Sequence, residues 1–390
     1  MAETLADPFS PEPFRIDVPQ ETIDDLQNRL CNTRWPDQLP GTTWEYGADI
    51  TALRKLCRHW SETFDWRQSE SLLNAWPQFT VNIDGQRIHY AHIRSTHSNA
   101  MPLVLTHGWP GSIAEFLKIV GPLTDPAAHG GDPDDAFHVV VPSIPGYGFS
   151  GPTTDRGWDV ARVARATATL MAGLGYDRYV AQGGDWGSVI SSHIGVLDAG
   201  HVAGIHINMV VARPPTGGSP LDGVLPEEMA GLAYMANFRG HETGYQEIQK
   251  TRPQTLAYGL TDSPAGLAGW ILEKFRQWSD CDGDPFNTFT LDELCTNIMI
   301  YWVTGTINSS TRLYYESLGP DRATPLPRVN VPTGCALFPK ELYQAPRVWA
   351  DAQYNVQHWS RFAHGGHFAA MEQPVELVND IRAFVRTLRS

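Results

Sequence analysis

The sequence predicts an α/β fold with a mainly parallel sheet, helices on both faces and an inserted helical lobe. Three observations predict it: short apolar stretches alternate with helical ones over residues 78–212, the alternation stops over 213–320, and it resumes over 321–390. Such alternation favours parallel strands joined by crossover helices. A chain of 390 residues is long enough for one large domain with an inserted lobe, or for two domains.

Residues 1–77 are predicted to form a mostly helical N-terminal lobe. Helices are expected at 20–31, where Ile23, Leu26 and Leu30 share one face, and at about 48–62 and 66–75. These helices carry too few apolar positions to close a core of their own. We therefore expect the lobe to pack on the rest of the chain.

The first part of the α/β core, residues 78–212, should open with a hairpin that turns at Asp84-Gly85. Further strands are expected at 103–105, 137–141, 179–181 and 206–209, and helices near 112–123, at 158–174 and at about 187–197. A helical cap follows over 213–320. The second part of the core, 321–390, should hold a strand at 331–338 and a helix at about 373–388.

Composition excludes several function classes. A net charge of -14 argues against a nucleic-acid or anionic-membrane partner. No run of 18 apolar residues occurs, and the acidic segment 1–7 lacks the features of a secretory signal, so neither a membrane span nor secretion is expected. Five scattered cysteines without a CxxC pair fit reduced thiols in a cytoplasmic protein.

The central motif is Gly183–Gly187 (GGDWG), placed between a predicted strand and a predicted helix. A nucleophile flanked by glycines at such a turn stands exposed at the end of the strand, because the glycines permit a sharp bend and close helix packing. The middle residue is Asp185, so the predicted nucleophile is a carboxylate. The alternative is an Asp that only caps the helix.

A second motif, His107–Ser112 (HGWPGS), directly follows an apolar strand. A loop at this place can direct a backbone N–H towards the nucleophile, and the residue after the nucleophile supplies another. The N–H groups of Trp109 and Trp186 are therefore the oxyanion-hole candidates. The alternative is a Gly/Pro turn without a role.

The third motif is Gly365–Phe368 (GGHF), near the C-terminus. His367 stands where a hydrolase of this type places its base, after the nucleophile and the acid in chain order. Glu341, in the loop after strand 331–338, is the predicted acid, with Asp351 as the alternative. His364 could form a metal pair with His367, but no Cys or carboxylate cluster accompanies it, so no metal is expected.

Two further patterns are set aside. Gly146–Gly151 matches GxGxxG, but prolines on both sides indicate a loop rather than the start of a helix, so no dinucleotide and no other cofactor is expected. His89 and His92 lie on one strand, where a spacing of three places them on opposite faces. They are therefore not expected to share a metal.

The motifs together resemble the epoxide hydrolases of the microsomal type, including soluble fungal and bacterial members. The resemblance covers nearly the whole chain and is carried by residues 107–111, 184–187 and 366–368 and by the segment that begins at Pro13-Phe14. Among the bacterial members, the chain is similar to the branch of enediyne antibiotic pathways. The resemblance implies an α/β-hydrolase fold, with an N-terminal lobe that clasps the helical cap.

The resemblance also implies two cap tyrosines that hold the epoxide oxygen. One matches Tyr245 in Gly244–Gln246, and the other matches Tyr314 at the end of the stretch that starts at Tyr301, with the adjacent Tyr315 as an alternative. Membrane-bound relatives carry an N-terminal anchor, and segment 1–7 does not resemble one. A cytoplasmic location is therefore expected.

The expected reaction converts an epoxide and water to a vicinal diol, through an ester on Asp185 that water activated by His367 hydrolyses. No cofactor or metal is needed. The abundant aromatic residues favour a bulky, apolar epoxide as substrate. A haloalkane dehalogenase and a non-catalytic ligand-binding relative are the alternatives, and a homodimer stays open.

Overall fold

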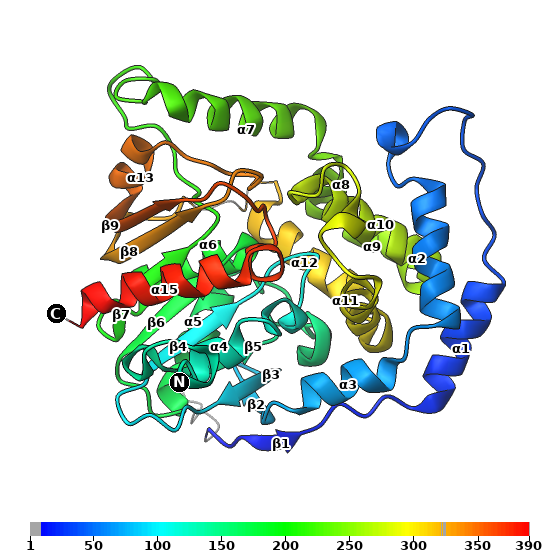
Figure 1. The fold of residues 1–390 in the computed structure, drawn as a ribbon, viewed down its shortest axis with the longest axis horizontal. Coiled ribbons are helices and arrows are strands. Elements are labelled where there is room, and N and C mark those ends of the chain that lie inside the picture. The colour runs from blue at the N-terminus through cyan, green and yellow to red at the C-terminus, as the bar shows by residue number, and fades with distance from the viewer. Residues whose placement is uncertain (1–8, 321, 323–324, 390) are drawn as a thin grey trace, which may run out of the picture.

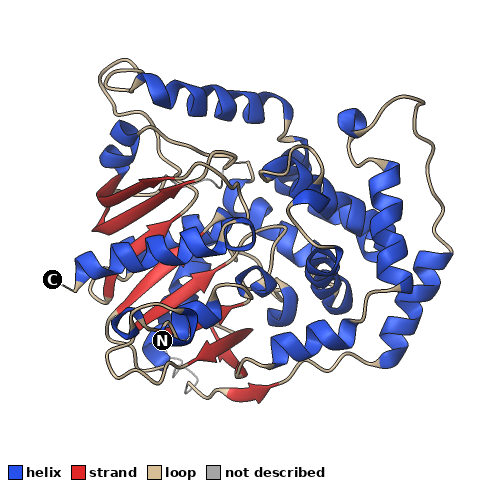
Figure 2. Cartoon of the chain, viewed as in Figure 1, coloured by secondary structure: helices blue, strands red, loops and turns tan. Residues whose placement is uncertain are grey.

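A computed structural model describes residues 9–320, 322 and 325–389. Over these residues a single nine-stranded sheet forms the centre of the molecule, with the strand order β1-β2-β3-β5-β4-β6-β7-β8-β9 (Figures 1 and 2). The sheet is antiparallel from β1 to β5 and parallel from β5 to β9, which confirms a mainly parallel sheet. The strands are β1 (Glu12–Phe14), β2 (Gln78–Ile83), β3 (Gln86–Ile93), β4 (Met101–Thr106), β5 (Phe137–Pro142), β6 (Tyr179–Gly183), β7 (Val202–Ile207), β8 (Val329–Leu337) and β9 (Tyr354–Arg361).

Three N-terminal helices lie where the sequence predicts them, and Figure 1 shows them in blue along one side of the molecule. They are α1 (Gln20–Cys31), α2 (Ile50–Glu62) and α3 (Trp66–Asn74). Their apolar faces pack on helices of the 213–320 stretch, and the hydroxyls of Ser69 and Thr296 bond at 2.7 Å across this contact. The expectation that this segment packs on the rest of the chain is confirmed.

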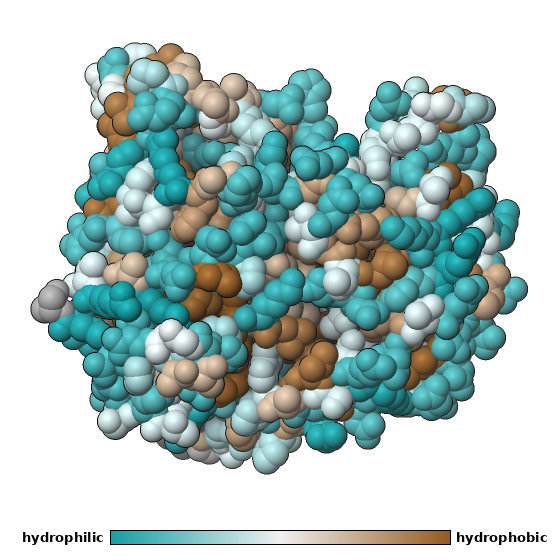
Figure 3. Space-filling view, in the orientation of Figure 1, coloured by the Kyte–Doolittle hydropathy of each residue, from teal (hydrophilic) through white to brown (hydrophobic). Residues whose placement is uncertain are grey.

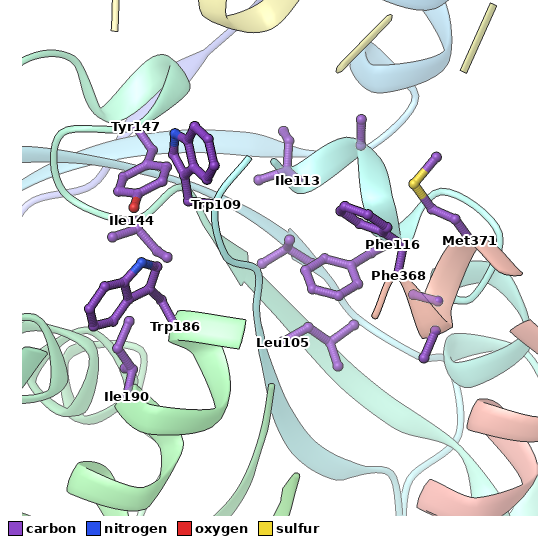
Figure 4. Packing of buried hydrophobic residues seen from close by; sticks show 14 of the residues in the cluster. Leu105, Trp109, Ile113, Phe116, Ile144, Tyr147, Trp186, Ile190, Phe368 and Met371 are labelled. Atoms are coloured by element: carbon purple, nitrogen blue, oxygen red, sulfur yellow. The ribbon is translucent and has the colours of Figure 1, made fainter. Parts of the chain in front are cut away.

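The helices around the sheet largely follow the prediction. They are α4 (Val120–Thr124), α5 (Val160–Gly173), α6 (Asp185–Leu197), α13 (Arg347–Gln353), α14 (Ala369–Glu372) and α15 (Pro374–Leu388). The hairpin turns at Asp84 and Gly85, with φ angles of 54° and 73°, as a two-residue turn requires. Figure 4 shows apolar side chains of β4, α6 and the loop after β4, among them Leu105, Ile113 and Ile190, packed close to the C-terminal end of β4.

One predicted helix is wrong. In place of a helix over 112–123 the chain forms a 3-10 turn at Ile113–Phe116 and, after a break, the short helix α4. Pro122 is the reason, because a proline fits the first turn of a helix but not its interior. A helix that contains Pro122 must therefore begin near residue 120.

One predicted strand is displaced. β7 spans Val202–Ile207 rather than 206–209, and its pairing with β6 ends at Ile207. Gly204 interrupts the apolar pattern of the strand, yet it is needed there, because a Cβ at this position would lie 2.9 Å from side-chain atoms of Phe384 and Leu388 on α15 and its C-terminal end. The short β1 and the edge strand β9 were not predicted, because neither presents a run of apolar residues.

Among the described residues, six α-helices lie between β7 and β8 and are called the cap helices here. They are α7 (Met229–His241), α8 (Gly244–Thr251), α9 (Pro253–Asp262), α10 (Pro264–Trp278), α11 (Leu291–Thr304) and α12 (Ile307–Leu318). Figure 1 shows α8–α12 gathered beyond the ends of the parallel strands, whereas α7 runs apart from them along the upper edge of the view. The site described below lies where these helices meet the sheet.

The surface shown in Figure 3 is mostly hydrophilic, with small hydrophobic patches between hydrophilic side chains. Across the described part of the chain, each helix is too short or too polar to span a bilayer. The expectation for segment 1–7 lies outside the described residues.

Candidate active site

Asp185 stands at the bend between β6 and α6, where the sequence predicts a nucleophile. Its φ angle is 49°, a left-handed conformation that non-glycine residues rarely adopt. The bend is tight, and it requires a glycine at position 187, because a Cβ there would lie 1.8 Å from the Thr106 carbonyl oxygen. Gly184, and not Asp185, occupies the N-cap position of α6. A helix-capping role for Asp185 is therefore wrong, and its carboxylate is free for other contacts.

The loop after β4 delivers a backbone donor to this carboxylate. The Trp109 N–H donates to Asp185 Oδ1 at 2.7 Å. This approach requires a glycine at position 108, because a Cβ there would lie 2.2 Å from the same oxygen. Trp186, the second predicted donor, lies in the first turn of α6, where backbone N–H groups have no partner within the helix.

His367 contacts two carboxylates, one through each ring nitrogen. Its Nε2 lies 3.3 Å from Asp185 Oδ2, and its Nδ1 lies 2.8 Å from Glu341 Oε1. Glu341 is 1% exposed, and its Oε1 also accepts a bond from the Leu342 N–H. The structure thus brings the three predicted residues together, with the His367 imidazole between the carboxylates of Asp185 and Glu341.

Two residues that were considered beside this group lie elsewhere. Asp351, the alternative acid, pairs with Arg347 on α13 and has a half-exposed side chain. The side chain of His364 is 80% exposed, while that of His367 is buried. In the described parts of the chain, no group of three or more His, Cys, Asp or Glu side chains is arranged to hold a metal ion.

The electrostatics of His367 depend on its neighbours. Burial by itself lowers the pKa of the imidazole, but the negative charge of Glu341 and the contact with Asp185 raise it, and the pKa lies well above its usual value. Loss of the negative charge on Asp185 would remove one of these two supports and lower the imidazole pKa, so that more of His367 would be unprotonated and able to accept a proton.

The two predicted cap tyrosines face the same carboxylate. The Tyr245 ring, on α8, stacks on Trp109 with centroids 5.4 Å apart, and the Tyr314 ring, on α12, meets Trp186 edge-on at 4.8 Å. Burial raises the pKa of both hydroxyls well above the usual value, so both carry their protons at neutral pH. Tyr315 is only partly buried, and Arg322 lies over its ring.

Two cavities meet at the Asp185 carboxylate, and Asp185 is the single described residue that lines both. The cap cavity, of about 310 Å³, is bounded by Tyr245, Tyr314 and apolar side chains such as Leu318. The small cavity, of about 20 Å³, is bounded by His367 and by the loop after β4. The first volume is large enough for a small organic molecule and the second for about one water.

Three residues near the site were not singled out from the sequence. Trp278 ends α10, packs its ring against His367 at 5.0 Å and accepts the His367 N–H on its carbonyl oxygen at 2.9 Å. Tyr147 lies beside Trp109 (Figure 4) and is buried. Glu115 lines the small cavity. The aromatic pair carries no sequence signal among so many aromatic residues, whereas Glu115 follows Ser112 at the spacing of a helix cap.

The two patterns that were set aside form a loop and two histidines with separate contacts. Gly146–Gly151 is a loop with a 3-10 turn and opens no helix. His89 bonds to Ser143 and Gln78, and His92 bonds to Tyr176, so the two imidazoles have separate partners.

Comparison with known proteins places this geometry in a family. Residues 11–116 match the family described as "Epoxide hydrolase N terminus", and residues 101–226 match the family described as "alpha/beta hydrolase fold". "Epoxide hydrolase 1" of Sus scrofa is 38% identical over 98% of this chain and 90% of its own length. The chain belongs to the epoxide hydrolase family of the microsomal type.

Solved structures of this family have the same fold. The juvenile hormone epoxide hydrolase of the silkworm Bombyx mori superposes with a TM-score of 0.90 at 32% identity, covering 98% of this chain and 96% of its own. The Aspergillus niger epoxide hydrolase superposes with a TM-score of 0.87 at 34% identity, covering 98% of both chains. The α/β-hydrolase fold and the epoxide hydrolase class expected from the sequence are confirmed, and they favour epoxides over haloalkanes.

Proposed function

We propose that this epoxide hydrolase opens its substrate by attack of Asp185 on a ring carbon and then hydrolyses the resulting ester with water activated by His367. One observation carries the proposal. The Asp185 carboxylate lies between a backbone donor, at 2.7 Å, and the His367 imidazole, at 3.3 Å, where a cavity for an organic molecule meets a cavity for a water.

In the first step a carboxylate oxygen of Asp185 bonds to the epoxide carbon, and the ring C–O bond breaks. Tyr245 and Tyr314 hold the departing oxygen, and one of them transfers its proton to it. Their high pKa values suit this role, because a protonated phenol is a donor at neutral pH. The product of this step is a hydroxy-ester of Asp185 and one tyrosinate.

In the second step water bonds to the ester carbon and gives one proton to His367 Nε2. The N–H groups of Trp109 and Trp186 stabilise the oxyanion, an effect worth about 3–4 kcal/mol per donor. The intermediate collapses, the bond to the diol oxygen breaks, and this oxygen takes the proton from His367. The proton left on the Asp185 carboxyl returns to the tyrosinate, while Glu341 keeps the imidazole in the required tautomer.

His367→Gln tests this sequence of steps. The variant should form the ester but fail to hydrolyse it, so intact-protein mass spectrometry after mixing with styrene oxide should find Asp185 carrying the mass of the substrate. A single turnover of the unaltered enzyme in ¹⁸O water should place the label in the Asp185 carboxyl. Label found only in the diol would mean direct attack by water and would overturn the proposal.

The finer assignments are also proposals. The apolar side chains of the cap cavity support a bulky, apolar epoxide, and the sequence resemblance supports a place near the enediyne-pathway branch. The division at residues 77, 212 and 320, the cytoplasmic location and a homodimer rest on the sequence. Limited proteolysis, cell fractionation and light scattering would test them.

A further inference from the structure

The small cavity contains an acidic side chain that the mechanism above does not use. Asp185, His367 and Glu115 all line this space, which holds about one water. We propose that Glu115 holds the hydrolytic water between His367 and the Asp185 ester. This inference rests on the ester mechanism and adds a third group that contacts the reacting water.

The Glu115 carboxyl is fixed beneath the loop that contains Trp109. It fills the space beside Gly111, because a Cβ at that position would lie 1.4 Å from Glu115 Oε1. The backbone of Gly108 and Ser112 lies close enough to this carboxyl to lower its pKa, against the effect of burial. A side chain fixed in this way has little freedom to move and can orient a bound water at little entropic cost.

A purely structural role has to be weighed against this one. Ser112 and Glu115 have the spacing of a capping box, and the Ser112 hydroxyl accepts the Ala114 N–H at 3.2 Å. A capping role explains why the Ser112 backbone lies beside the carboxyl. It does not explain why the backbone of Gly108, in the loop that contacts the nucleophile, also lies beside it, or why Glu115 stands in the wall of the small cavity.

The charge state of Glu115 suits a position beside His367. Burial raises its pKa to about 8, with His367 lowering it and the charge of Asp185 raising it, so the carboxyl of the resting enzyme is mostly neutral at pH 7. An ionised carboxylate there would hold the imidazole in its protonated form and weaken it as a base. A neutral carboxyl can bind water without doing so.

The chemistry gives the water three partners. One of its protons goes to His367 Nε2, its lone pair forms the bond to the ester carbon, and its second hydrogen needs an acceptor. A Glu115 oxygen at the cavity wall can accept that hydrogen, which stays on the oxygen throughout the step. The carboxyl therefore orients the water and exchanges no proton with it.

A second cavity connects Glu115 to the outside. This side cavity, of about 200 Å³, lies between the N-terminal helices, α11 and the turn that contains Glu115, and its wall includes Asp65, Gln68 and Lys118. Glu115 is the single described residue that lines both the small and the side cavity. Glu115 thus stands in the wall between the small cavity and a second space that is separate from the cap cavity.

Single-turnover experiments on Glu115→Ala and Glu115→Gln, with styrene oxide as probe and His367→Gln as the ester-accumulating reference, test the proposal. Formation of the ester, followed by intrinsic tryptophan fluorescence, should keep its rate. Loss of the ester, followed by rapid-quench mass spectrometry, should slow roughly 100-fold in Glu115→Ala, because the water is no longer positioned. Glu115→Gln should slow less, because its amide oxygen can still accept a hydrogen.

Glu372→Gln is the matched control. Like Glu115, Glu372 is partly buried, and its carboxyl accepts the N–H groups of Phe368 and Asp280, but it lines none of the three cavities. We expect this change to lower the melting temperature and to affect both steps alike.

The same pattern in the Glu115 variants, or loss of the ester at the unaltered rate, would overturn the proposal. If Glu115→Ala does not fold, Glu115→Gln alone decides. Absence of any ester, even in His367→Gln, would instead reject the proposed function.

Discussion

The two cavities on either side of Asp185 differ in size and in the kind of group that lines them. The cap cavity is large and mainly apolar, and its lining includes two buried tyrosines. The small cavity is about the size of one water and brings together an imidazole and a carboxyl group. The organic molecule fits only one side of the nucleophile, and the proposed base stands on the other.

In the proposed mechanism, this difference lets one carboxylate serve two reactions that need opposite surroundings. Ring opening needs acids and an apolar environment, whereas ester hydrolysis needs a base and a single, oriented water. With the two sets of groups in separate spaces, water does not compete with the carboxylate for the epoxide. Variants on one side should therefore change one step, and only variants of Asp185 should change both.

The largest effect is expected for Asp185→Ala, which removes the carboxylate that lines both cavities. Diol formation from styrene oxide, measured by chromatography, should fall by roughly 10⁴-fold or more, because the nucleophile and its ester are lost. Asp351→Asn, a change at a half-exposed carboxylate on α13, serves as the control and should keep full activity. Substantial turnover by Asp185→Ala would show that Asp185 is not the nucleophile of this reaction.

A smaller effect, confined to the side of the small cavity, is expected for Glu341→Gln. Loss of the ester should slow by roughly 10³-fold, since the imidazole loses the anion that orients it. Removing this negative charge also lowers the His367 pKa. Because the base acts in its unprotonated form, the acidic limb of the rate of ester loss should move to lower pH. A limb that stays in place would show that another group titrates in this step.

On the side of the cap cavity, Tyr314→Phe should slow ester formation by about 100-fold and leave ester loss unchanged, because a proton donor to the epoxide oxygen is removed. Stopped-flow fluorescence separates the two rates. Tyr315→Phe is the matched control, because this neighbour is partly exposed and lies under Arg322. If Tyr315→Phe produced the larger loss, the donor would have been assigned to the wrong residue of the pair.

The smallest effect is expected for Val189→Phe, which narrows the cap cavity from α6. The ratio of kcat/KM for styrene oxide to that for propylene oxide should fall by about 10-fold, as a lost fit of a few methylene groups would give. Competition between the two epoxides in one vessel measures this ratio directly. An unchanged ratio would place the bulky part of the substrate elsewhere.

The site could be predicted from the sequence only where the chain itself fixes the geometry. Asp185 and Trp109 were found because close glycines on each side leave a signature that can be read locally. His367 and Glu341 followed from chain order. Tyr245 and Tyr314 came from the family resemblance, because a tyrosine on a cap helix is indistinguishable from a packing residue until the cap is folded over the sheet.

Glu115 could not be predicted, because its role depends on a space that appears only when the loop closes above it. In the sequence it is a glutamate after a serine in a stretch expected to be a continuous helix, which would have placed it on a solvated face. Pro122 requires a helix that begins near residue 120, so Ile113–Phe116 forms a separate 3-10 turn, and the Glu115 carboxyl occupies the space beside Gly111. Similarly, Gly204 hid the start of β7, because a glycine weakens an apolar pattern while allowing α15 to approach.

The hydrogen bond between the Trp278 carbonyl and the His367 N–H has a consequence for movement of the cap helices. This bond joins the C-terminal end of α10, a cap helix, to the segment that carries the His367 imidazole. A movement of α10 away from the sheet would therefore shift the imidazole relative to Asp185. We therefore expect that catalysis requires α10 to stay in contact with the segment that carries His367.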